Sequence, residues 1–153
     1  MARKTPRKTP KKTPGKVHDS TCPVAFALDL FGDRWSLLVV RDLMLRGERS
    51  YGELLAGGEG IATNVLADRL KMLELADVIS GRPDPLNRRR KIYALTKKGL
   101  DLAPVMIEII RWSGNHDGRP DARKALARRI EQDADGVLAD IRAGIPVSRW
   151  PDV

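Results

Sequence analysis

The side chains best suited to chemistry in this chain are cations, and they gather in two short segments. Residues 1–16 hold seven basic and no acidic residues, and residues 82–98 hold seven basic residues and one acid. These two segments carry the excess behind a net charge of +8. Basic charge concentrated in this way is typical of a surface that binds a polyanion, most often a nucleic acid. A solubilising tail and a solvated loop are the alternative.

Nucleophiles and metal ligands are scarce in the sequence. Cys22 is the one cysteine, and His18 and His116 are the two histidines. These counts exclude an internal disulfide and a cysteine-based zinc cage. The sequence contains no Ser-His-Asp ordering, no phosphate-binding glycine loop and no dinucleotide-binding motif. We therefore expect no enzyme: no catalytic residue, no metal and no cofactor.

Neither a membrane span nor a secretory signal is expected. The longest strongly apolar run, residues 35–40, is far shorter than the ~20 residues that cross a bilayer. No apolar segment follows the basic N-terminus, as a signal peptide would require. We expect a cytoplasmic, nucleoid-associated protein.

A short helix, a turn and a longer helix position the candidate binding residues. Residues 50–53 have the Ser-x-x-Glu form of a capping box, which predicts a short helix. A glycine-rich turn over 56–60 follows, and leucines at 66, 70 and 73 give the helix over 62–76 an inward face. This order is typical of a helix-turn-helix. The outward face carries Thr63, Asn64, Ala67, Asp68 and Lys71, with Arg69 at the flank.

A small β-hairpin is predicted next. Residues 78–82 and 88–95 favour strands, and residues 83–87 contain an Asp-Pro turn. Two strands around a basic loop, directly after a helix-turn-helix, form a wing, which we place at 82–91. The predicted fold is therefore mainly α with a β-hairpin wing: a winged helix-turn-helix over residues 20–116.

Apolar helices flank this motif. A helix opens at Cys22-Pro23, a buried helix over 35–45 takes Trp35 into the core, and a helix capped by Thr96 is apolar nearly all round, with a kink expected at Pro104. That last helix is either one more core helix or a dimer seam, and we favour the seam. The predicted dimer interface comprises Val24, Leu28, Val105, Ile109 and Trp112.

The two ends lie outside the predicted domain. Residues 1–19 form a basic tail in which (Arg/Lys)-Lys-Thr-Pro repeats, and proline at every fourth position predicts disorder. Residues 117–153 form a C-terminal helical extension after a linker over 114–120. Its helix has Leu126, Ile130, Val137, Leu138 and Ile141 on one side, and Gly136 weakens it. Residues 143–153 are predicted to be irregular.

Ordered motifs carry a family resemblance over about residues 20–116. They are Cys22-Pro23-Val24, Gly32-Asp33-Arg34-Trp35, Arg49-Ser50-Tyr51-Gly52-Glu53-Leu54, Gly60-Ile61-Ala62-Thr63-Asn64-Val65-Leu66-Ala67-Asp68-Arg69-Leu70, Arg89-Arg90-Lys91-Ile92-Tyr93-Ala94-Leu95-Thr96-Lys97-Lys98-Gly99 and Leu102-Ala103-Pro104-Val105. This set resembles the HxlR family, bacterial winged-helix transcription regulators close in architecture to the MarR type. The resemblance implies a homodimer whose first and last family helices pair across the two-fold axis. It also implies that the 62–76 helix enters the major groove and the wing lies along the backbone or minor groove.

Roles for the helix residues follow from base chemistry. Thr63 and Asn64 start the recognition helix, where base edges are usually met; Asn pairs with adenine and the Thr methyl with thymine. Thr63 is alternatively a plain N-cap. Arg69 reaches a phosphate or a guanine, or pairs with Asp68 or Glu74. Asp68 contacts a cytosine or orients Arg69.

The phosphate-binding residues are expected at the wing and at the first helix of the motif. In the wing we expect Arg88 and Arg90 to face DNA, with Arg89 in reserve, because alternation along a strand turns neighbours apart. Ser50 and Tyr51 start the short helix and suit a phosphate; Ser50 also serves the capping box.

Together, the residue patterns and the resemblance predict a transcriptional regulator, expected to be a repressor, that binds double-stranded DNA as a homodimer. The alternative is a nonspecific nucleoid-associated binder dominated by the basic tail. In some members of the family a cysteine at the position of Cys22 acts as a redox sensor; the alternative is a small buried residue. The small-molecule effector is unknown.

Overall fold

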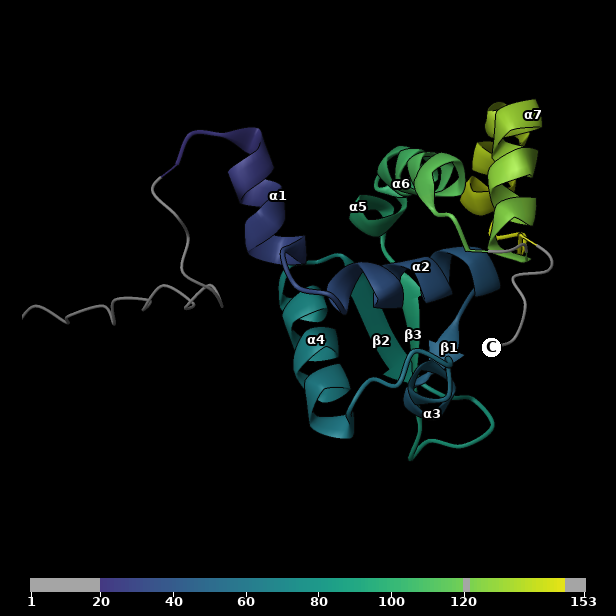
Figure 1. Ribbon diagram of the computed structural model, residues 1–153. Helices are drawn as coiled ribbons and strands as arrows, with labels where there is room; N and C mark the ends of the chain where they lie inside the picture. The colour runs from purple at the N-terminus through teal and green to yellow at the C-terminus, as the bar shows by residue number, and fades with distance from the viewer. Residues whose placement is uncertain (1–19, 120–121, 148–153) are drawn as a thin grey trace, which may run out of the picture.

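The computed structural model describes residues 20–119 and 122–147, and the predicted basic tail therefore lies outside the described residues (Figure 1). Helices dominate and a small sheet accompanies them, as predicted. In chain order the elements are α1 (Pro23–Phe31), α2 (Ser36–Arg46), β1 (Arg49–Ser50), α3 (Tyr51–Leu55), α4 (Thr63–Leu75), β2 (Ile79–Pro83), β3 (Lys91–Leu95), α5 (Lys97–Leu100), α6 (Ala103–His116) and α7 (Ala122–Arg142). None of the described helices is long and apolar enough to cross a membrane.

The sheet has three antiparallel strands in the order β1-β3-β2. The β2–β3 hairpin pairs Ile79 with Leu95 at one end and Pro83 with Lys91 at the other. β1 was not predicted from the sequence, because its two residues pair with the far side of β3 and leave no local pattern.

The predicted second strand of the wing starts three residues too early. It was expected from residue 88, but β3 begins at Lys91. Residues 84–90 instead form a turn that Asp84 closes: its amide donates to the Arg90 carbonyl at 2.9 Å, and its carboxylate accepts from the Leu86 amide at 2.9 Å. The three arginines 88–90 therefore lie in a turn, where strand alternation does not apply.

Helix α2 lies at the centre of the core. In Figure 1 it crosses between α5 and α6 above and α4 and the sheet below. Val40 of α2 and Leu66 and Leu73 of α4 are fully enclosed, which confirms the predicted inward face of α4. Trp35, predicted as core, is half-buried at the start of α2. The middle of the domain is thus a helix-on-helix contact that fixes the orientation of α4.

The helix predicted after Thr96 is two helices. The Thr96 hydroxyl caps α5 by accepting from the Gly99 amide at 3.1 Å, and α6 starts anew at Ala103. The expected kink at Pro104 is wrong, because proline sits in the first turn of α6, where its missing N–H costs nothing. Helix α6 also continues to His116, so the predicted linker over 114–120 is shorter than expected.

Helix α7 belongs to the same core. Ile130 and Val137 are each 1% exposed, and α7 packs along α6. A break interrupts it at Asp133, with φ −154° and ψ 72°, three residues before Gly136. The Asp133 carboxylate accepts from the Gly136 amide at 2.9 Å and so caps a new helical segment. Residues 143–147 are irregular as predicted, and the Val147 amide donates to the Leu45 carbonyl at 3.0 Å; residues 148–153 lie outside the described residues.

Replacing Ile130 with alanine tests whether α7 is part of the fold. We expect Ile130→Ala to lower the free energy of unfolding by about 2–5 kcal/mol, because it leaves a cavity between α6 and α7. Urea unfolding of the full chain measures this. Leu86→Ala is the control: Leu86 is 97% exposed at the wing tip, and its loss should change stability by less than ~0.5 kcal/mol. Equal effects of the two variants would show that α7 adds nothing to the core.

Candidate nucleic-acid interface

The outward face of α4 is the central feature of the candidate interface. Leu66, Leu70 and Leu73 point inward, each at most 2% exposed. The opposite face is exposed and carries Asn64, Ala67, Asp68 and Lys71, as expected. Thr63, expected on the same face, lies on the side of the leucines and is exposed because it starts the helix. The N-cap of α4 is Ala62, so the alternative that Thr63 is the cap is wrong. Thr63 and Asn64 are the first two helical residues and project from the exposed N-terminal turn.

Tyr51 and Ser50, at the start of α3, both form hydrogen bonds within the chain. The Tyr51 hydroxyl donates to the Thr63 carbonyl at 2.7 Å, which ties α3 to the first turn of α4. Ser50 is 2% exposed, and both hydrogen bonds of the predicted capping box with Glu53 are present. The Ser50 side chain is thus enclosed and serves the capping box, and a phosphate at this helix N-terminus stays a prediction. The hydrogen bond from the Ser50 hydroxyl, then that from its amide, holds the pKa of Glu53 below its ordinary value.

The wing tip offers two unengaged cations. Arg88 and Arg89 are exposed and form no ion pair with any residue that the structure describes. Arg90 is exposed too, but it donates to the Ser50 hydroxyl at 2.9 Å and lies 3.9 Å from the Asp84 carboxylate. Arg88 and Arg89, and not the expected Arg88 and Arg90, are thus the cations most available to a ligand.

Other basic residues of the 82–98 segment hold elements together. Arg82 pairs with Glu48, at 2.5 Å, and Lys91 pairs with Glu74 of α4 at 2.7 Å. The hydrogen bond to Glu74 raises the pKa of Lys91. Lys98 donates to the Ala76 carbonyl at the C-terminus of α4, at 2.7 Å. Part of the basic charge seen in the sequence therefore anchors the wing and α5 to α4.

Arg69 anchors α4 to the start of α2. Its guanidinium lies 3.2 Å from the Asp33 carboxylate, so neither predicted partner, Asp68 nor Glu74, is the observed one. Asp33 also accepts from the Trp35 amide at 2.8 Å, from the Ser36 amide at 3.0 Å and from the Ser36 hydroxyl. Burial raises the pKa of Asp33, but these hydrogen bonds and the charge of Arg69 outweigh burial and lower it.

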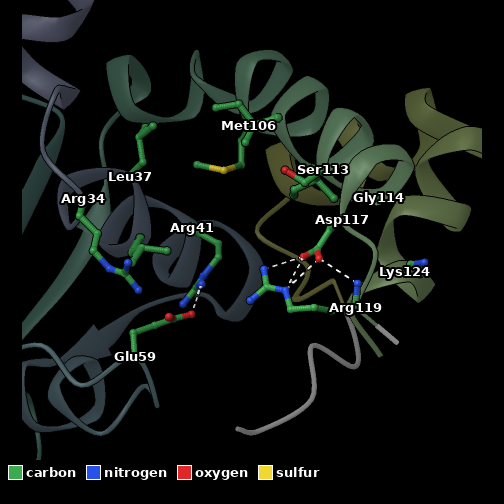
Figure 2. A pocket seen from close by; sticks show the side chains of 13 residues that line it. Arg34, Leu37, Arg41, Glu59, Met106, Ser113, Gly114, Asp117, Arg119 and Lys124 are labelled. Atoms are coloured by element: carbon green, nitrogen blue, oxygen red, sulfur yellow. Dashed lines mark hydrogen bonds and ion pairs between the residues drawn. The ribbon is translucent and has the colours of Figure 1, made fainter. Parts of the chain in front are cut away.

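A second ion pair fixes the turn before α4. Arg41 of α2 is 7% exposed, and it donates to Asp42 at 2.8 and 3.0 Å and to Glu59 at 2.7 Å. Glu59 belongs to the glycine-rich turn, in which Gly60 adopts φ +73°. A Cβ at Gly57 would meet the Asp42 carboxylate at 2.8 Å, so the turn lies directly against this pair. No local pattern in the sequence predicts the pair of Arg69 with Asp33 or that of Arg41 with Glu59, which Figure 2 shows.

The remaining predicted residues lie away from α4. Cys22 precedes α1 and is exposed, so the alternative of a small buried residue is wrong. The predicted interface residues on α1 and α6 are all exposed: Val24, Leu28, Val105, Ile109 and Trp112. Within residues 20–119 and 122–147, no group of His, Cys, Asp or Glu side chains is arranged to hold a metal ion.

Comparison with known proteins identifies relatives among helix-turn-helix transcriptional regulators. Residues 30–120 match the family described as HxlR-like helix-turn-helix. An uncharacterized HTH-type transcriptional regulator of Synechocystis sp. is 37% identical over 86 residues, which is 56% of this chain and 63% of that protein. The match thus spans less than two thirds of that relative. The HTH-type transcriptional regulator YodB of Bacillus subtilis is 32% identical over 96 residues, 62% of this chain and 85% of that protein.

Solved structures show the same architecture. The crystal structure of PA1607, described as a putative transcription factor, superposes with a TM-score of 0.60 at 37% identity, covering 67% of this chain and 70% of that one. The reduced form of YodB from B. subtilis gives a TM-score of 0.53 at 30% identity, covering 67% of this chain and all of that one. The winged-helix fold, with a MarR-like arrangement, is therefore shared with solved transcriptional regulators.

The Asp33 anchor predicts a pH-dependent contribution to stability. Its pKa is lowered in the folded chain, so its stabilisation is present above the ordinary carboxylate pKa of ~3.9 and is lost as the pH falls through the folded value. We expect Asp33→Asn to be less stable than the wild type by about 1 kcal/mol at pH 7, since bonds to a charged acceptor are the stronger ones. Urea unfolding at pH 7 and below pH 3 measures the difference in unfolding free energy between the two proteins. A difference that persists unchanged below pH 3 would contradict the role assigned to the Asp33 carboxylate.

Proposed function

Because the chain belongs to the HxlR-like helix-turn-helix family of transcriptional regulators, we propose that it represses transcription by binding duplex DNA as a homodimer, with α4 in the major groove. The observation that carries the proposal is the two-faced α4, with a leucine stripe enclosed in the core and a polar face exposed to solvent. A helix presented in this way, beside a basic wing, is the reading element of winged-helix proteins.

Asn64 is the residue we assign to base reading. It is exposed in the first turn of α4, where recognition helices meet base edges, and its amide suits adenine. Thr63, exposed beside it, offers a methyl group to thymine. Asp68 is exposed one turn further on, where its carboxylate suits a cytosine amine. Arg69 is held by Asp33, so its role in the proposal is to place α4 rather than to read a base.

The wing supplies the sequence-independent part of binding. Arg88 and Arg89 extend from the tip of the turn and are placed to meet phosphates or the minor groove. Arg90 stiffens the turn through Ser50 and Asp84. An ordered reading helix is superfluous for a nonspecific nucleoid binder, and its presence favours the sequence-specific regulator over that alternative.

The dimer follows from two uncovered apolar faces. None of the described residues of α1 is buried, and Val24, Phe26 and Leu28 are about 60% exposed. On α6, Met106, Ile107 and Ile110 pack into the chain's own core, while Val105, Ile109 and Trp112 face outward. Apolar side chains gathered in this way mark an association surface. A second copy covers both faces if α1 of one protomer packs on α6 of the other.

Asn64→Ala tests the reading role. On a duplex selected by the full-length protein, we expect the variant to bind ~5- to 100-fold more weakly, the worth of one bidentate base contact. Its affinity for random duplex should change less than about two-fold, because phosphate contacts are untouched. Fluorescence anisotropy at fixed salt measures both. Asn115→Ala, an exposed asparagine on α6, is the matched control and should bind both duplexes like the wild type. Equal losses on both duplexes would refute base reading by Asn64.

Trp112→Glu tests the dimer. Light scattering at micromolar concentration should give twice the 17.0 kDa chain mass for the wild type and the single mass for the variant, because a carboxylate would be buried in the apolar seam. Leu86→Glu places the same charge on the exposed wing tip and should leave the dimer intact. A monomeric wild type would overturn this part of the proposal.

A further inference from the structure

The tip of the wing presents the most exposed large apolar side chain in the part of the chain that the structure describes. Leu86, in the turn over 84–90 between β2 and β3, is 97% exposed, and the next, Trp112 on α6, is 66% exposed. Leu86 belongs to neither of the apolar faces of α1 and α6, so the proposed dimer does not account for it. A single exposed leucine is common on protein surfaces. Its meaning therefore depends on how the turn holds it and on what lies beside it.

Hydrogen bonds fix the backbone that carries Leu86. Asp84 is 8% exposed, and its carboxylate accepts from the Leu86 amide at 2.9 Å. The Asp84 amide donates to the Arg90 carbonyl at 2.9 Å, and the Asn87 amide donates to the Asp84 carbonyl at 3.2 Å. Pro85 restricts φ directly before Leu86. A backbone that is already ordered loses little conformational freedom when its tip binds a partner.

Two available cations lie beside Leu86 in the turn. Arg88 and Arg89 are exposed and form no ion pair with the residues that the structure describes. Asp84, the one acid of the turn, is enclosed and lies 3.9 Å from the Arg90 guanidinium. The tip thus combines one apolar side chain with two positive charges. A DNA minor groove suits this combination, because phosphates line both of its edges and the stacked base pairs at its floor accept apolar wedges.

Contacts at the base of the wing set the distance between its tip and α4. Lys91, the first residue of β3, pairs with Glu74 of α4 at 2.7 Å. Arg90 donates at 2.9 Å to the hydroxyl of Ser50, which caps α3, the helix before α4. Figure 1 shows the turn extending at the end of the molecule where α4 begins. The tip therefore meets a duplex at a fixed offset from the groove that α4 occupies.

We propose that Leu86 is a wedge, which enters the minor groove beside the site of α4 and inserts between two base pairs; this inference rests on the proposed function. Insertion unstacks one base step and kinks the duplex toward the major groove. Arg88 and Arg89 bind the phosphates that the kink draws toward the tip. Pyrimidine–purine steps kink most easily, so Leu86 adds specificity for such a step without any hydrogen bond to a base.

Energy transfer between a donor and an acceptor dye at the two ends of a selected duplex of about 30 base pairs measures the kink. We expect the full-length wild type to raise the transfer efficiency, because a kink brings the ends together. At a protein concentration that saturates the duplex, Leu86→Ala should lose at least half of that rise. Ile145→Ala removes a 52% exposed apolar side chain after α7 and should bend the duplex like the wild type.

Anisotropy titrations over a range of salt concentrations separate the wedge from the charges of the wing. Leu86→Ala should bind about five-fold or more weakly at every salt concentration, with an unchanged salt slope, because no cation is lost. Arg88→Gln should reduce the slope of log affinity against log salt by about 0.9, the value of one phosphate contact. Leu86→Met keeps an apolar side chain of similar volume and should retain both the bend and the affinity.

Three results would each overturn the wedge: a wild type that binds the selected duplex without bending it, equal bends with the wild type and Leu86→Ala, or a loss of bending by Leu86→Met as large as that by Leu86→Ala. The first result uses only the wild type and so stands even if a variant fails to fold. A wild type that binds all duplexes alike, or none, would overturn the proposed function. A wild type that binds its selected site and leaves it straight would overturn the wedge alone.

Discussion

Three leucines on one face of α4 lose nearly all contact with solvent when the helix packs against α2 and the sheet. Burial of Leu66, Leu70 and Leu73 contributes roughly 1.5–3 kcal/mol each, as an upper estimate. A helix advances about 100° per residue, so enclosing this stripe turns Asn64 and Asp68 to the outside, whereas Thr63 is exposed because it is the first residue of the helix. The same hydrophobic contact therefore stabilises the domain and orients the residues to which we assign DNA reading.

Burial fixes which face of α4 points outward, and three polar contacts fix where the helix sits. Arg69 ties its middle to Asp33 at the start of α2. Tyr51 ties its first turn to α3 through the Thr63 carbonyl, and Arg41 holds the preceding turn through Glu59. Each contact is specific in direction, whereas apolar packing tolerates small shifts.

Periodic patterns in the sequence predicted helices well and long-range contacts poorly. The bounds of α4 agree within one residue because its leucine spacing is a local signal, and the capping box of Ser50 is the local signal that located the start of α3. The wing arginines were assigned to a strand because nothing in the local pattern shows that Asp84 closes a turn around them. The kink expected at Pro104 is wrong because the sequence alone does not separate a helix interior from a first turn, where this proline lies. The Asp33–Arg69 pair joins residues 36 positions apart and had no detectable pattern.

Selection of genomic fragments by the purified protein tests most directly whether α4 reads DNA sequence. The purified full-length protein and a form lacking residues 1–16 would each be incubated with fragmented genomic DNA at near-physiological salt, and the bound fragments sequenced. The account predicts a small set of enriched sites with two-fold symmetry, retained by the shortened form. Broad recovery without a shared motif, lost when residues 1–16 are removed, would contradict it and favour a nonspecific binder dominated by the basic tail.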